Sequence, residues 1–269
     1  MPDMTSTTAG DPPEDPIDDK PMPLLEHLTE LRTRLLWSAV AFGLCFALCY
    51  YFSRSIYSFL VQPLADILAT RGANRRLIYT ALYEAFFTYL RVAFFGAAFL
   101  AFPVIATQIY MFVAPGLYRS EKRAFLPFLL ATPVLFFAGA ALAYYFVFPA
   151  AWKFFLSFES VDGAGGLPVQ LEAKVSEYLS LVMRLIFAFG LAFQLPVLLT
   201  LLAKVGIISS RGLKKYRRYA YVGMFVVAAI ITPPDVITQT GLAVPMILLY
   251  EISIFAAGWV EKKPVDSDA

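Results

Sequence analysis

Apolar residues fill most of the chain in charge-free stretches that are long enough to cross a lipid bilayer. Four such stretches are clear, at Leu35–Phe52, Val92–Val113, Ala124–Phe148 and Leu185–Ala203. Because every backbone amide inside a bilayer needs a hydrogen-bond partner within its own segment, each stretch predicts a transmembrane helix. Prolines inside these stretches should kink the helices rather than break them, and they are Pro103, Pro127, Pro133 and Pro196.

Two shorter apolar runs follow towards the C-terminus. Tyr219–Ile231 would cover only about 20 Å of a hydrocarbon core about 30 Å thick. It stops at Thr232-Pro-Pro-Asp235, and Val236–Tyr250 then continues towards Trp259. One interpretation makes the two runs a single re-entrant hairpin, but we favour two short spans because Pro-Pro-Asp suits a polar turn at a membrane interface. The sequence therefore predicts an all-α, polytopic membrane protein with six transmembrane helices, of which the fifth and sixth are short.

The composition agrees with lipid as the solvent for most of the chain. Of the 269 residues, 59% are hydrophobic and 16% are charged, and the mean hydropathy is +0.66, whereas soluble domains are about a quarter charged. This composition excludes an intrinsically disordered chain and a disulfide-rich secreted scaffold. A formal net charge of +2 is too balanced to indicate nucleic-acid binding.

The two ends of the chain differ from the apolar body and suggest its topology. Residues 1–23 are acidic and rich in proline, so we expect a disordered tail there, a single transmembrane domain over residues 24–259 and a second short tail over 260–269.

No signal peptide or transit segment is recognisable, which favours a bacterial cytoplasmic membrane. Most of the 22 lysines and arginines then fall in inner loops, which predicts that both termini are cytoplasmic, although the first outer loop also carries several arginines.

Two outer loops carry helical periodicity of their own. Apolar residues recur at helical spacing between Ile56 and Leu68, and again between Leu171 and Val182. Both segments are expected to form amphipathic helices that lie on the membrane surface or pack on one another.

The sequence contains no recognisable catalytic or metal-binding motif. His27 is the only histidine and precedes the first span, so a membrane-embedded Ser–His pair is impossible, and no metal cluster or phosphate-binding glycine loop is present. Cys45 and Cys49 lie one turn apart in an apolar run and are interpreted as packing residues. No ionisable side chain lies in the four long spans, where Gln194 is the polar residue nearest a centre. We therefore expect neither an enzyme nor a cofactor.

Three polar segments at the ends of the spans remain, and each has a simple structural explanation. Glu30 and Arg34 have the favourable i, i+4 order of a surface ion pair on a helix that leads into the first span. Glu121 lies among three bases of an inner loop and would offset their charge. Asp235 follows Pro-Pro at the opposite face and would cap the last helix.

Taken together, these segments resemble the signature motifs of the TatC family, the core subunits of twin-arginine protein translocases. The motifs, in chain order, are His27-Leu-x-Glu30-Leu-Arg32-x-Arg34-Leu35, Phe112-x-Ala-Pro-Gly-Leu-Tyr-x-x-Glu121, Phe189-Gly-x-x-Phe-x-x-Pro196 and Thr232-Pro-Pro-Asp235-Val-x-x-Gln239. The resemblance implies a glove-shaped protein of six helices with both ends in the cytoplasm. It also implies a multimeric complex that recognises signal peptides with paired arginines and exports folded proteins, using the proton-motive force and the single-span partners TatA and TatB.

By this resemblance, the binding site for the signal peptide lies at the inner face. Glu30 and Glu121 would accept the two arginines, Phe112 would lie on the same face, and Arg32 and Arg119 would orient the carboxylates. Physical chemistry supports such a pairing, because a guanidinium offers a planar fork that matches a carboxylate, whereas a lysine ammonium is a point charge.

The same resemblance implies that partner helices dock at the opposite face. Thr232 and Gln239 match positions near which partners bind in this family, and Asp235 lies between them; Thr232 could instead bond to the backbone of its own helix. The family pattern has Glu where this chain has Gln194, so a mechanism that needs a proton on this side chain is not expected here. We expect a structural or partner-binding role for Gln194.

Two other functions compete with this one. A six-span carrier for a small molecule, such as a vitamin-uptake subunit, would need a polar pocket between helices near the middle of the membrane, for which Gln194 alone is thin support. A structural scaffold would leave Glu30 and Glu121 unexplained.

Overall fold

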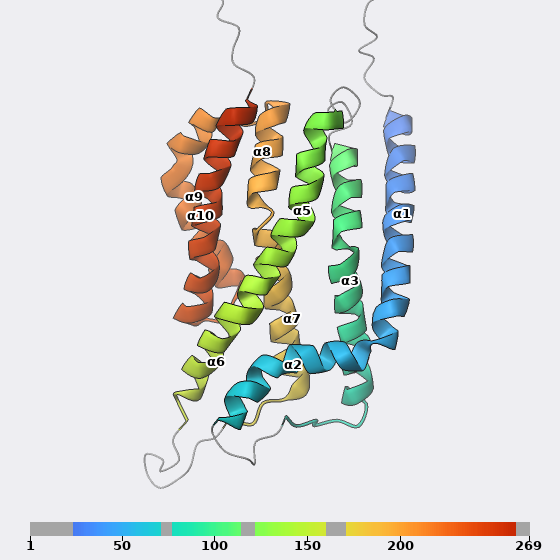
Figure 1. The fold of residues 1–269 in the computed structure, drawn as a ribbon, viewed down its shortest axis with the longest axis vertical. Helices are drawn as coiled ribbons and strands as arrows, with labels where there is room; N and C mark the ends of the chain where they lie inside the picture. The colour runs from blue at the N-terminus through green and yellow to red at the C-terminus, as the bar shows by residue number, and fades with distance from the viewer. Residues whose placement is uncertain (1–23, 71–76, 114–121, 160–170, 262–269) are drawn as a thin grey trace, which may run out of the picture.

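The computed structural model describes residues 24–70, 77–113, 122–159 and 171–261, and these are almost entirely helical (Figure 1). The helices, in chain order, are α1 (Leu24–Tyr51), α2 (Ser53–Ala69), α3 (Glu84–Val113), α5 (Lys122–Leu142), the π-helical turn η1 (Ala143–Val147), α6 (Phe148–Leu156), α7 (Val175–Ala192), α8 (Leu195–Val205), α9 (Ser210–Ile231) and α10 (Val236–Val260). Apart from them, an isolated β-bridge joins Ile78 to Lys174. The expected all-α fold is confirmed.

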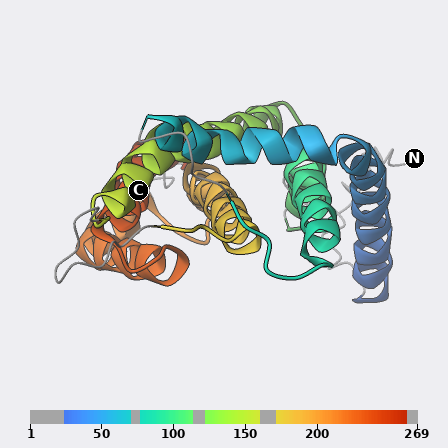
Figure 2. The same ribbon diagram turned by 90° about the horizontal axis from the view of Figure 1, so that it is seen from below.

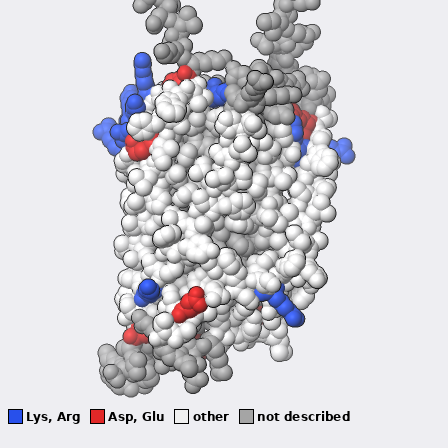
Figure 3. Space-filling view, in the orientation of Figure 1, with Lys and Arg blue, Asp and Glu red and all other residues white. Residues whose placement is uncertain are grey.

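Five helical segments of the described chain are long and apolar enough to cross a membrane. They are α1, α3, the continuous run from α5 to α6, the run from α7 to α8, and α10. The other helix expected to cross, α9, packs beside α10, but its first half is basic, so the count of six spans and their orientation stay predictions. Charged side chains gather near the two ends of the molecule and leave an uncharged middle, as lipid requires (Figure 3).

The helices stand side by side in an arched row. Seen from below, α1 and α9 lie at the two ends of the row, with α3 and α7 between them (Figure 2). At the lower end of the molecule α2 runs across the row rather than along it (Figure 1). The helix α1 packs mainly on α3, whereas α10 packs on α8 and α9. The arch agrees with the glove shape that the family resemblance implies.

The main core is formed chiefly by η1, α6, α7 and α10, and two glycines permit the close approach of α5 to α7 beside it. A Cβ atom on Gly139 would lie 2.5 Å from the carbonyl oxygen of Phe189, and one on Gly190 would lie 2.6 Å from the ring of Phe136. Both aromatic rings are completely buried. Any larger residue at either glycine would force these two helices apart.

The fourth apolar run is interrupted near its middle. α7 ends at Ala192 and α8 begins at Leu195, with a turn at Phe193 and Gln194 between them. The expectation that Pro196 would only kink this span is therefore wrong. Pro196 has no N–H to donate, and it lies in the first turn of α8, where a helix needs no such donor. The other three prolines lie inside α3 and α5 as expected.

The two amphipathic segments of the outer loops are both helical and contact one another. The first is α2, which buries Leu60 and Leu64. The second is not a separate surface helix, because α7 runs from Val175 straight into the fourth apolar run. The hydroxyl of Tyr178 in α7 donates to the carbonyl of Leu60 at 3.1 Å, so the expected packing of the two segments is confirmed.

The last helix is longer than expected. α10 has 25 residues, so the prediction of a short sixth helix is wrong. Within α10 the carboxylate of Glu251 is paired, because Arg217 of α9 lies 2.7 Å from it and the hydroxyl of Tyr221 donates to it. At the same end, the backbone amide and hydroxyl of Ser210 donate to Glu261 at 3.1 and 2.6 Å, and these bonds lower the pKa of Glu261.

Candidate functional site

A stacked pair of rings holds the N-terminal end of α1 against the C-terminal end of α3. His27 and Phe112 lie with their ring centroids 4.3 Å apart and their planes inclined by 11°. A stacked aromatic pair contributes about 0.5–1.5 kcal/mol beyond its buried area. The contact brings the first two sequence motifs together, although 85 positions separate them in the chain.

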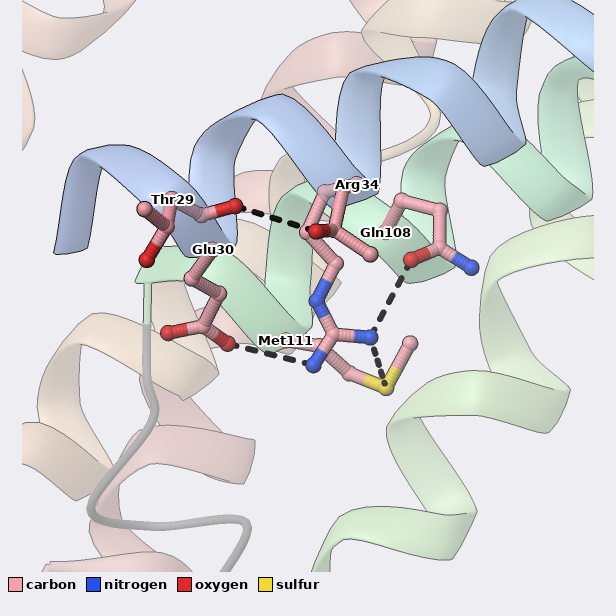
Figure 4. Close-up of polar contacts among 6 residues, drawn as sticks. Thr29, Glu30, Arg34, Gln108 and Met111 are labelled. Carbon is pink, nitrogen blue, oxygen red and sulfur yellow. Dashed lines mark hydrogen bonds and ion pairs between the residues drawn. The ribbon is translucent and has the colours of Figure 1, made fainter. Parts of the chain in front are cut away.

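The side chain of Arg34 links Glu30 to α3 (Figure 4). Its Nη2 donates to Oε1 of Glu30 at 3.1 Å, which confirms the predicted i, i+4 ion pair. Its Nη1 donates to Oε1 of Gln108 at 3.2 Å and approaches the sulfur of Met111 at 3.5 Å. The carboxylate of Glu30 is thereby held in one orientation beside the end of α3.

Glu30 keeps one oxygen available. Its Oε2 accepts no hydrogen bond from any residue that the structure describes, and its side chain is 23% exposed. Arg32 is exposed and forms no ion pair within the described ranges, whereas Arg34 orients Glu30, so the orienting role expected of Arg32 stays a prediction. An approaching cation can therefore meet an oriented carboxylate without first breaking the pair with Arg34.

The other half of the expected site lies outside the described residues. Arg119 and Glu121 fall in residues 114–121. α3 ends at Val113 and α5 begins at Lys122, and both of these ends lie at the same end of the molecule as the start of α1 (Figure 1). The contact of Glu121 with a ligand stays a prediction.

The turn between α9 and α10 gives structural roles to two of its polar residues. Thr232 donates from its hydroxyl to the carbonyl of Ala228 at 2.9 Å, which is the alternative raised from the sequence. Asp235 is buried and caps α10, accepting from the backbone amide of Thr238 at 2.7 Å and from its hydroxyl. Both carboxylate oxygens of Asp235 are thus engaged, while the half-buried side-chain amide of Gln239 forms no hydrogen bond with the described residues.

An apolar face of α9 lies beside this turn, and no helix of the described residues covers its exposed side chains. Met224 and Ala228 are the buried residues of α9, which packs mainly on α10. Its exposed large side chains are Tyr216, Tyr219, Val222, Phe225, Val226, Val227 and Ile230. The face is suited to lipid or to a helix from another chain.

The side chain of Gln194 forms a hydrogen bond from the break in the fourth span to α5. It lies in the turn between α7 and α8, is 8% exposed, and donates from Nε2 to the carbonyl of Thr132 at 3.0 Å. Its Oε1 is buried and has no hydrogen-bond partner among the described residues. An unpaired buried acceptor costs about 1–3 kcal/mol, so a donor from another chain would be stabilising at this position.

Sequence reasoning missed the part that α3 contributes to the site. Gln108 lies four residues before Phe112, and this spacing places both on one face of a helix. The spacing was therefore the available signal, but nothing in the sequence shows that Arg34 reaches this face. No group of His, Cys, Asp and Glu side chains that could hold a metal ion is found among the described residues.

Comparisons with known proteins agree on one family. Residues 26–245 match the family described as Sec-independent protein translocase protein (TatC). The TatC of Magnetococcus marinus is 52% identical over 247 residues, which are 92% of this chain and 88% of that protein. The TatC of Escherichia coli K12 is 41% identical over 233 residues, 87% of each chain. A crystal structure of the twin-arginine translocase receptor TatC matches with a TM-score of 0.72 at 38% identity, covering 87% of this chain and 99% of that one.

Proposed function

The chain belongs to the TatC family of Sec-independent protein translocase proteins, and we propose that it is the signal-peptide receptor and assembly core of a twin-arginine translocase. Its role is in protein transport across a membrane. We place it in a bacterial cytoplasmic membrane with both termini inside, acting on folded cargo with the proton-motive force. A six-span vitamin-uptake carrier finds no support in these comparisons.

The observation that carries the proposal is the carboxylate of Glu30, which Arg34 orients beside the end of α3. Arg34 fixes one oxygen of Glu30 and leaves Oε2 to a ligand. A hydrogen bond to a charged group contributes about 1.5–3 kcal/mol, and screening at a wet interface keeps the value near the lower end. An arginine of the signal peptide would use this oxygen, and the second arginine would pair with Glu121, with Arg32 and Arg119 nearby.

The role of Glu121 can be tested separately from that of Glu30. In Glu121→Ala, the affinity for a twin-arginine peptide should fall to that for the twin-lysine version. The reason is that one arginine loses the carboxylate with which its guanidinium would form a bidentate pair. Glu177→Gln, a change at an exposed acid near the start of α7, serves as the control and should leave the discrimination intact. Equal discrimination by Glu121→Ala and the unaltered protein would refute the assignment.

For the partner subunits, we propose docking along the apolar face of α9. TatA and TatB each contribute one span in this proposal, and a polar side chain in such a span would bond to the free amide of Gln239 near Thr232. Interhelical hydrogen bonds of this kind contribute about 0.6 kcal/mol each. Asp235 supports the surface by capping α10, and Gln194 offers a further unpaired acceptor for the assembled complex.

Site-specific crosslinking tests this docking. A photoreactive residue at position 239 or 226 should capture a single-span partner in active membranes, whereas one at position 44, on the exposed face of α1, should capture less. Equal capture from all three positions would contradict docking at α9. Capture of a second copy of this chain from position 239 would replace the partner assignment with self-association.

A further inference from the structure

An apolar cavity of about 380 Å³ lies between α1, α2, α3 and α5. It sits in the half of the molecule that holds α2, which is the outer half in the predicted orientation (Figure 1). Its walls include Cys49, Leu60, Gly96, Phe99, Ala140 and Tyr144. The hydroxyl of Tyr144 is turned away into a 2.6 Å bond with the carbonyl of Phe59, so the walls offer almost no polar atoms.

The cavity opens beside large apolar side chains that are themselves exposed. Phe59, Leu100, Phe137 and Tyr145 line it and are between 39% and 64% exposed. All four belong to segments at or next to the apolar spans. The opening therefore faces the hydrocarbon of a bilayer rather than water.

The volume of the cavity limits which kind of molecule can fill it. An apolar cavity stays dry, and an empty one forfeits the dispersion contacts of its walls. A helix with its side chains is about 10–12 Å wide, which is too wide for a space of this volume. A single acyl chain is slender and apolar, and it is supplied by the surrounding lipid.

A cation lies one helical turn outward from the cavity. Arg91 precedes Phe95, a residue of the cavity wall, by four positions, so both lie on one face of α3. It also immediately precedes the predicted span Val92–Val113, so the predicted topology places it near the outer headgroups. Arg91 is exposed and forms no ion pair with the residues that the structure describes, and a guanidinium of this kind suits a phosphate.

We propose that this cavity is a lipid-binding site for an anionic phospholipid of the outer leaflet. One acyl chain fills the space between α2, α3 and α5, and the phosphate pairs with Arg91. The bound lipid would complete the packing beneath α2, where the protein alone leaves a gap. This site is distinct from the proposed peptide site and does not depend on it.

Native mass spectrometry of the full-length protein tests the site directly. The protein is placed in phosphatidylcholine nanodiscs with a minor fraction of phosphatidylglycerol, and the lipids that remain bound on release are counted. Ala141→Trp fills the opening from an exposed position of the wall and should reduce retained phosphatidylglycerol at least about tenfold. Ala47→Trp, at an exposed position of α1 outside the cavity, is its control and should retain lipid as the unaltered protein does.

The headgroup contact is tested by Arg91→Gln. This variant should still retain phosphatidylcholine but lose the preference for phosphatidylglycerol, whereas Arg184→Gln, at an exposed arginine that also immediately precedes a predicted span, should keep it. A phosphatidylglycerol with a diazirine on its acyl chain should crosslink to the segment that contains Phe137 and Tyr145.

Several results would overturn the proposal. They are unchanged lipid retention in Ala141→Trp, an unchanged lipid preference in Arg91→Gln, or crosslinks spread evenly over the apolar surface. If Ala141→Trp does not fold, lipid retention is measured instead in Leu100→Trp, which fills the same opening from α3. Crosslinking to a protein partner in native membranes, with no lipid adduct, would assign the cavity to an interface instead.

Discussion

Glu251 and Arg217 face each other across the contact between α9 and α10, with Oε2 of the acid 2.7 Å from Nη2 of the base. The pair neutralises an acid that would otherwise be costly within an apolar helix. Because the two side chains are 26% and 43% exposed, solvent screens the attraction, and a contribution of about 1 kcal/mol is expected.

Breaking this pair should destabilise the α9–α10 contact. Glu251→Gln and Arg217→Gln should each lower the Tm of the purified protein by about 2–4 °C, and the double variant should lose less than the sum, because both act through one contact. Arg218→Gln is the control, since that guanidinium lies over the ring of Tyr219 instead. Fully additive losses in the double variant would show that the two residues are not coupled.

A second contact, at the N-terminal end of α9, predicts a pH dependence. The hydrogen bonds from Ser210 hold the pKa of Glu261 below its ordinary value of 4.5. A lowered pKa in the folded state stabilises the protein fully above the unfolded value, and this stabilisation is lost as the pH falls through the folded value. The Tm of the unaltered protein should therefore exceed that of Glu261→Gln by a constant amount down to about pH 5. This difference in Tm should shrink below about pH 4.5. A difference in Tm that does not shrink as the pH falls below about 4.5 would contradict the assignment.

The stacked rings at the inner end of α1 should matter for peptide binding. Phe112→Ala removes the ring on which His27 stacks, so the start of α1 loses this support, Glu30 is less well positioned, and the affinity for a twin-arginine peptide should fall about two- to tenfold. Phe112→Tyr keeps the ring and should bind normally. Fluorescence anisotropy with a labelled peptide measures both, and Phe225→Ala on the distant α9 is the control. Normal binding by Phe112→Ala would remove this residue from the site.

Two substitutions of Gln194 can distinguish a structural role of its side chain from a role in assembly with a partner. Gln194→Leu removes one hydrogen bond and one unpaired buried acceptor together, so its Tm should change little. If the amide serves a partner, export in cells should nevertheless be lost, and Gln194→Glu should retain it. Export that survives in Gln194→Leu but fails in Gln194→Glu would contradict a partner-binding role.

The sequence was sufficient for features that repeat along a helix. Runs of apolar residues predicted the helices, and the spacing of Glu30 and Arg34 predicted their ion pair. It failed where contacts between distant helices decide the outcome. The length of the apolar run predicted a short last helix, and it did not show that Arg217 of α9 pairs with Glu251 inside α10, nor that the side chain of Arg34 reaches Gln108.

The break at Gln194 shows the same limit within one span. A proline inside an apolar run permits either a kink or an interruption, and the choice depends on what satisfies the freed groups. In the structure, the backbone amides of Phe193 and Gln194 donate to the carbonyls of Phe189 and Leu191, so the turn keeps its own backbone groups paired. The side chain of Gln194 adds a contact with α5 through the carbonyl of Thr132, which the sequence does not reveal.

The central claim is that the oriented carboxylate of Glu30 recognises an arginine of the signal peptide. Its most direct test is a titration of twin-arginine and twin-lysine peptides against the full-length, detergent-solubilised protein and its Glu30→Gln variant. The unaltered protein should prefer the arginine peptide by about tenfold or more, and Glu30→Gln should lose most of that preference. A preference that is the same in both proteins would contradict the account.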